Sequence, residues 1–102
     1  MFVTFRQNNI GGYFIEDDNV GAYVIIEGND LKEILDKASN IFEDYREYCT
    51  CCGERWDDDL KDENDLKTEP MIWGESVYEY MASWCRDYAI IYRIDGTKEK
   101  VN

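Results

Sequence analysis

Histidine is absent from this 102-residue chain. The sequence therefore lacks the side chain that most often acts as a general base near neutral pH and that often binds zinc in open sites. It also lacks a serine nucleophile motif and a glycine-rich phosphate loop. Carboxylates are plentiful, but they gather in a polar segment where little burial would raise a pKa. We expect no enzymatic activity; a paired-carboxylate hydrolase and a catalytic zinc held by three thiolates stay open as alternatives.

Long apolar runs are also missing. No stretch approaches the roughly 18 apolar residues that a membrane span requires. The first residues, Met1–Arg6, lack the basic start, apolar middle and small-residue end of a signal peptide. We therefore expect a cytoplasmic protein. In that reducing compartment, the four cysteines favour metal binding over disulfides.

Positive charge is scarce, because 11 lysines and arginines face 23 acidic residues and leave a net charge of −12. Such a surface repels nucleic acid phosphates and anionic membranes, so we expect no direct contact with either. The charge has two interpretations. It can simply maintain solubility, or it can attract a basic partner, such as the nucleic-acid channel of another protein.

The chain is expected to form a single domain over residues 1–102, because chains usually divide only beyond roughly 200 residues. Its apolar fraction of 44% and aromatic fraction of 15% are sufficient for one modest core. Three β-rich runs, Phe2–Phe5, Tyr13–Ile15 and Ala22–Ile26, are interpreted as a meander. The asparagines and glycines of 7–12 tolerate positive φ and favour a turn after the first run.

Two helices are predicted after these strands. Asp30 and Glu33 form a capping-box pattern, and apolar residues follow at helical spacing as far as Tyr45. Ser76 and Glu79 repeat the pattern ahead of a shorter helix near 77–86, and a strand and a tight turn follow over 88–96. We predict an α+β fold: a small, mainly antiparallel sheet of four to five strands with two helices on one face and a zinc knuckle.

The knuckle is predicted from Cys49-Thr-Cys-Cys-Gly53, which contains C-x-x-C-G. Two thiolates at this spacing, Cys49 and Cys52, can turn onto one ion while backbone N–H groups donate to the sulfurs. Gly53 lets the chain turn without a Cβ clash. A structural zinc normally has four ligands, so two more are needed.

Cys85, delivered by the second helix, is the expected third zinc ligand. The fourth is Cys51, Asp57 or water. Two alternatives stay open: Cys85 as a small buried hydrophobic residue, and a redox role for the C-x-x-C pair. Of the flanking residues, Trp56 is interpreted as a lid over the thiolates. Arg55 is interpreted as a donor to cysteine sulfur or as a charge that offsets the thiolates.

Two segments carry a resemblance to a known family. Gln7-Asn-Asn-Ile-Gly-Gly-Tyr-Phe14, the N-terminal motif, and Cys49-Thr-Cys-Cys-Gly-Glu-Arg-Trp56, the cysteine motif, resemble a family of small tailed-phage and prophage proteins. Those proteins carry Q-N-N-x-G-G-x-F, a strand and an amphipathic helix, then C-x-C-C-G-x-R-W. The resemblance covers residues 2–56, and 90–97 is more loosely similar to the family's terminal strand and turn. It implies a location in the cytoplasm of a bacterial host.

A small acidic prophage protein with a zinc site is also similar in size, charge and setting to a zinc-containing anti-CRISPR protein that acts on the type II effector nuclease. This likeness implies an inhibitor that binds the nuclease through an acidic surface. The alternative is a small structural or regulatory phage protein that binds another protein, unrelated to host defence. The acidic segment (54–69) is equally well interpreted as a solvated loop. As a binding surface, it supplies the candidate partner contacts Asp57, Asp58, Asp59, Asp62, Glu63 and Asp65.

Overall fold

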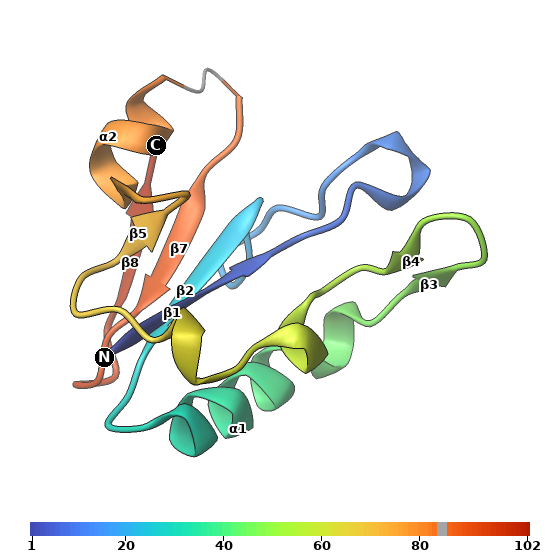
Figure 1. Cartoon of the computed structure of the whole chain (residues 1–102). Helices are drawn as coiled ribbons and strands as arrows, with labels where there is room; N and C mark the ends of the chain where they lie inside the picture. The colour runs from blue at the N-terminus through green and yellow to red at the C-terminus, as the bar shows by residue number, and fades with distance from the viewer. Residues whose placement is uncertain (84–85) are drawn as a thin grey trace.

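The computed structural model describes residues 1–83 and 86–102. Its centre is a four-stranded sheet with the strand order β1-β2-β7-β8 (Figure 1). The two outer pairs are antiparallel, whereas the central pair, β2 with β7, is parallel. The predicted α+β class and mainly antiparallel sheet are confirmed. The strands span Phe2–Arg6 (β1), Tyr23–Glu27 (β2), Ala89–Tyr92 (β7) and Lys98–Val101 (β8).

The first helix, α1 (Leu31–Phe42), begins where the capping pattern predicts. The Asp30 carboxylate accepts a hydrogen bond from the Glu33 N–H at 2.8 Å, which satisfies one of the free donors of the first turn. The apolar stripe of the helix packs against one face of the sheet. This core consists of Val3, Phe5, Val20, Val24, Ile26, Ile34, Ala38, Phe42 and Trp56.

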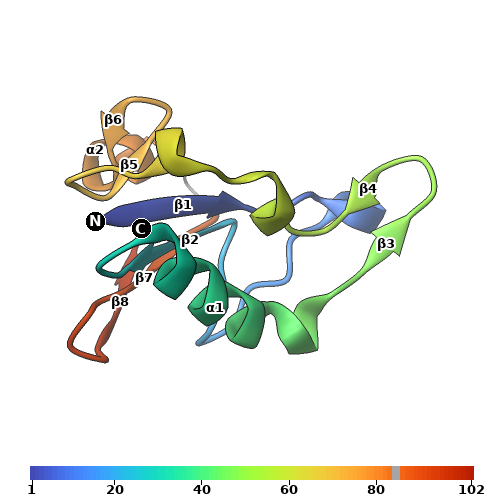
Figure 2. The ribbon, with the colours of Figure 1, turned by 60° about the horizontal axis from the view of Figure 1, so that its bottom comes forward.

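The second helix, α2 (Val77–Ala82), begins at Ser76, whose hydroxyl accepts from the Tyr78 N–H. It ends short of the predicted Arg86. Val77 and Met81 pack against the opposite face of the sheet from α1, so the prediction of two helices on one face is wrong (Figure 2). This second core consists of Phe2, Ala22, Tyr23, Ile25, Ile72, Val77, Met81, Ala89, Ile91 and Val101.

The physical reason for two covered faces lies in β2. Successive side chains of a strand point to opposite faces, and Ile25 and Ile26 are both fully buried. A strand that is apolar on both faces sits in the middle of a sheet and needs a cover on each side. The continuous apolar run 22–26 therefore indicated a central strand between two layers.

Two other strand predictions differ from the structure. Tyr13–Ile15 is a loop, and β1 and β2 pair directly, so the three-stranded meander is wrong. β8 was not predicted, because its Lys-Glu-Lys sequence has no apolar alternation and Val101 is its one buried residue. Charged residues are common on such an edge strand, where they discourage pairing with other chains.

The segment 56–76 runs along the outer edge of β1. Bridges join it to β1 near both ends of that strand, between Phe2 and Lys67 and between Gln7 and Trp56. In the part of the chain that the structure describes, no helix is long and apolar enough to cross a membrane. The remaining elements are two small hairpins, β3 (Tyr48–Cys49) with β4 (Gly53–Glu54) and β5 (Met71–Ile72) with β6 (Glu75–Ser76), and short 3-10 turns at Ile10–Gly12, Glu43–Tyr45, Asp58–Leu60 and Glu63–Asp65.

Candidate metal centre

Three thiols meet at the tip of the β3–β4 hairpin. The sulfur atoms of Cys49, Cys51 and Cys52 all lie within 4.8 Å of one another, with 3.2 Å from Cys49 to Cys51 and 3.9 Å from Cys51 to Cys52. Cys51 and Cys52 are exposed, and Cys49 is partly buried. The three thiols are free and close enough to hold one metal ion together.

The backbone at this tip has the geometry expected of a knuckle. The backbone N–H groups of Cys51 and Cys52 favour the thiolate form of Cys49. Gly53 has a φ of +88°, a region that residues with a Cβ rarely enter. The requirement for glycine after the second cysteine is therefore confirmed.

The hydrogen bonds within the cluster separate the acidities of its thiols. A hydrogen bond from the Cys51 thiol, aided by the backbone N–H groups, lowers the pKa of the Cys49 thiol to about 7. The hydrogen bond with Cys49 raises the pKa of the Cys52 thiol to about 11. One thiolate therefore forms readily near neutral pH, and thiolate is the form that binds metals.

The other residues expected as ligands are Cys85 and Asp57. Cys85 lies outside the described residues. Asp57 is not part of the thiol cluster. Its carboxylate accepts a hydrogen bond from the Arg6 N–H at 2.9 Å and forms an ion pair with Lys61 at 3.0 Å, so it helps to fasten the acidic segment to β1.

Asn8 fastens the cysteine hairpin to the N-terminal motif. Its side-chain amide donates to the carbonyl oxygens of Cys52 at 2.6 Å and Glu54 at 3.3 Å. Its backbone N–H donates to the carbonyl oxygen of Arg55 at 2.6 Å. The two motifs, far apart in the sequence, therefore form one structural unit.

Arg55 lies at the centre of this unit, with no exposed surface. Its guanidinium donates to Gln7 Oε1 at 2.8 Å, to the carbonyl oxygens of Ile10 and Tyr13 at 3.2 Å, and to the Glu47 carboxylate at 3.1 Å. Each guanidinium nitrogen donates to oxygen, so the interpretation of Arg55 as a donor to cysteine sulfur is wrong. The planar guanidinium has five N–H donors, so it can bond several loop oxygens that surround it.

Trp56 belongs to the α1 core. It is 2% exposed and stacks on Phe42, with 4.0 Å between ring centroids and 8° between ring planes. Burying so large an apolar surface against α1 stabilises the fold more than covering exposed thiols would. The interpretation of Trp56 as a lid over the metal site is wrong.

A comparison with models of protein families finds a match over the whole chain. The family described as "Domain of unknown function (DUF7296)" matches residues 1–102. The chain belongs to this family. No curated protein and no solved structure matches it.

In this DUF7296 chain, most of the acids predicted to contact a partner stabilise the acidic segment. Asp58 forms two hydrogen bonds of 2.7 Å with the Arg46 guanidinium. Asp62 and Asp65 form a reciprocal capping box around a short turn. Asp59 and Glu63 are exposed and, within 1–83 and 86–102, have no ion-pair partner. The acidic segment is therefore held in place by defined contacts, and it is not the solvated loop expected from its composition.

Proposed function

We propose that this chain is a non-catalytic, zinc-stabilised phage protein that inhibits a type II CRISPR effector nuclease by binding it. The observation that carries the zinc part is the exposed cluster of three thiols on an anchored hairpin. The inhibitory part rests on the acidity of the surface and on the resemblance to phage proteins and to a zinc-containing anti-CRISPR protein.

The chemistry of the donors favours zinc. Cys49, Cys51 and Cys52 offer three sulfur atoms, and thiolates select soft or borderline metals over magnesium and calcium. The hairpin has strands of two residues each, which is too short for stability without other support. A metal at its tip supplies such support, because binding to a site that the unfolded chain lacks contributes directly to folding free energy. Cys85 or water completes the coordination.

The state of the carboxylates supports binding over catalysis. Asp57 and Asp58 are held by Lys61 and Arg46, and Asp62 and Asp65 cap a turn. These four carboxylates are therefore taken up by structural contacts. Their arrangement suits a rigid, negatively charged surface.

A basic partner suits that surface. The net charge of −12 attracts a positively charged nucleic-acid channel and speeds association with it. Exposed charges of this kind are screened beyond about 8 Å at physiological ionic strength. Binding should therefore weaken as salt rises, mainly through a slower association rate.

The test measures binding of the purified protein to a type II effector nuclease by surface plasmon resonance, alongside its zinc content by elemental analysis. The variant Asp59→Lys/Glu63→Lys reverses the two free acids and leaves the structural pairs of Asp57 and Asp58 intact. It should associate more slowly and keep its zinc. The matched control, Glu43→Lys/Asp44→Lys, changes the charge equally at exposed positions after α1.

Equal slowing in both double variants would remove the acidic segment from the interface. A wild-type protein that neither binds a type II effector nor protects a phage from one would refute inhibition. It would leave the structural or regulatory phage role. Well under half an equivalent of zinc would refute the metal part independently.

A further inference from the structure

Trp73 occupies an unusual position in the β5–β6 hairpin. The two central residues of its turn, Trp73 and Gly74, have φ values of +52° and +81°, the signs required by a type I′ turn. Asparagine or glycine normally fills such positions, and a bulky residue there is an outlier. Trp73 is also 72% exposed, so packing of its ring does not account for the conformation. An outlier of this kind points to a functional use of the side chain.

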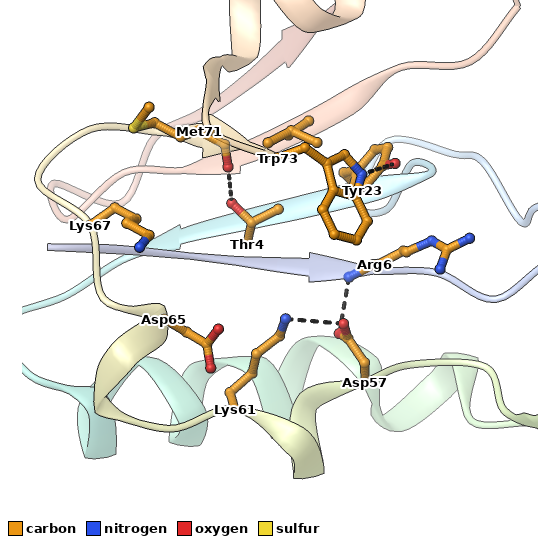
Figure 3. A pocket seen from close by; sticks show the side chains of 11 residues that line it. Thr4, Arg6, Tyr23, Asp57, Lys61, Asp65, Lys67, Met71 and Trp73 are labelled. Atoms are coloured by element: carbon orange, nitrogen blue, oxygen red, sulfur yellow. Dashed lines mark hydrogen bonds and ion pairs between the residues drawn. The ribbon is translucent and has the colours of Figure 1, made fainter.

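The ring of Trp73 faces a cleft between β1 and the segment 57–74 (Figure 3). The cleft has a volume of about 440 Å³, within the range of about 300–1,000 Å³ typical of small-molecule sites. The Thr4 hydroxyl lies at its wall and donates to the Met71 carbonyl oxygen at 2.6 Å, which ties the hairpin to β1. The Trp73 indole N–H donates to the Tyr23 hydroxyl at 3.4 Å and sets the orientation of the ring.

The cleft gathers positive charge in a strongly acidic protein. Arg6, Lys61 and Lys67 line it, together with Asp57 and Asp65. Asp57 is already paired with Lys61 at 3.0 Å, and Asp65 accepts from a backbone N–H at 2.8 Å. Arg6 and Lys67 have no ion-pair partner within the described parts of the chain. Two cations are therefore left for an anion from outside.

We propose that this cleft binds a small anion that carries a planar ring, with a nucleoside monophosphate as the simplest example. The ring stacks on the exposed face of Trp73, since aromatic stacking accepts any base. The phosphate lies toward Lys67, which supplies the charge and donors that phosphates require, while Arg6, at the other end of β1, adds to the positive charge of the cleft. The proposal is independent of the metal, because none of the cysteines lines the cleft among the described residues.

The experiment is isothermal titration calorimetry of the metal-loaded protein at low salt, with AMP, GMP, CMP and UMP as probes. Adenosine and inorganic phosphate serve as the two half-ligands. At least one mononucleotide should bind with a dissociation constant below about 1 mM. Each half-ligand should bind about tenfold or more weakly, because it lacks either the charge or the stack.

The decisive variant is Trp73→Asn. Asparagine favours positive φ, so it should keep or raise the melting temperature of the protein. It should nevertheless weaken mononucleotide binding by about tenfold or more, the scale of a lost base–aromatic stack. Lys67→Gln should weaken binding severalfold, whereas Lys32→Gln, the same change on exposed α1, should leave it unaltered.

Three results would overturn the proposal. One is a wild-type protein that binds no mononucleotide at about 1 mM. Another is full affinity in Trp73→Asn. The third is adenosine or phosphate alone binding as tightly as the mononucleotide.

Discussion

Replacement of Arg55 by methionine tests the link between the two motifs most directly. Methionine retains much of the apolar length of the side chain and removes the guanidinium. The change withdraws the donors from Gln7 Oε1, from the loop carbonyl oxygens of Ile10 and Tyr13, and from the Glu47 carboxylate. Gln7 Oε1 keeps a hydrogen bond of 2.6 Å from the Ile15 N–H, so the damage falls mainly on the other groups.

The expected cost follows from the burial of each partner. Glu47 has a side chain that is 40% exposed, so water can replace its lost partner at little cost. The carbonyl oxygen of Ile10 loses a donor in a buried setting and that of Tyr13 in a partly buried one. A buried, unsatisfied group costs about 1–3 kcal/mol. Together with the altered packing around Gln7, we expect about 2–4 kcal/mol, the sum of two such losses with one group partly exposed. Since 1 kcal/mol shifts the melting temperature of such a domain by about 4–8 °C, the melting temperature should fall by at least about 8 °C.

The assay is urea denaturation followed by circular dichroism, on metal-loaded protein throughout. Arg86→Met, the same substitution at an exposed arginine, should change the free energy of unfolding by no more than about 0.5 kcal/mol. A double-mutant cycle with Gln7→Met should give a coupling of about 1 kcal/mol or more, because the two side chains share one network. If Arg55→Met and Arg86→Met lost equally little stability, the buried guanidinium would not hold the motifs together.

Three further predictions concern the thiols. Cys52→Ser should lower the melting temperature of the metal-loaded protein strongly, whereas Thr50→Ser should do little, because only the first removes a metal ligand; equal small losses would count against a metal site. Without metal, alkylation of Cys49 should rise with a midpoint near pH 7, set by its lowered pKa, and a single midpoint near pH 9 for all thiols would contradict the hydrogen-bonded cluster. The same pKa shifts make the stability of the metal-free protein depend on pH. Stability should rise from pH 7 to 9, because the folded state loses the Cys49 proton before the unfolded chain does. Stability should fall above pH 9, because folded Cys52, with a pKa of about 11, retains a proton that the unfolded chain releases.

Features determined by residues close together in the sequence were predictable. α1 begins at Asp30 because a cap and the N–H that it accepts are three residues apart. The thiols of Cys49 and Cys52 converge, and Gly53 takes positive φ, for the same local reason. The α+β class followed from the order of apolar runs.

Features determined by distant residues were not predictable in this way. The sequence around Arg55 and Trp56 places them beside the cysteines, but Gln7 and Phe42, far away in the chain, determine where their side chains lie. The cleft at Trp73 also depends on a long-range contact, between β1 and the β5–β6 hairpin. The sequence did carry a signal for the contact between Arg55 and Gln7. The N-terminal motif and the cysteine motif occur together in the resemblance, and the structure joins them.

The contacts between the N-terminal motif and the cysteine motif have a consequence for which substitutions the fold tolerates. Asn8 supplies the amide that holds the cysteine hairpin, and Arg55 supplies the guanidinium that holds the loop from Gln7 to Tyr13. Each segment is held by hydrogen bonds from the other, so we expect a substitution in one to shift which residues are acceptable in the other. A transplant of the hairpin into a foreign scaffold would therefore have to carry the distant loop with it.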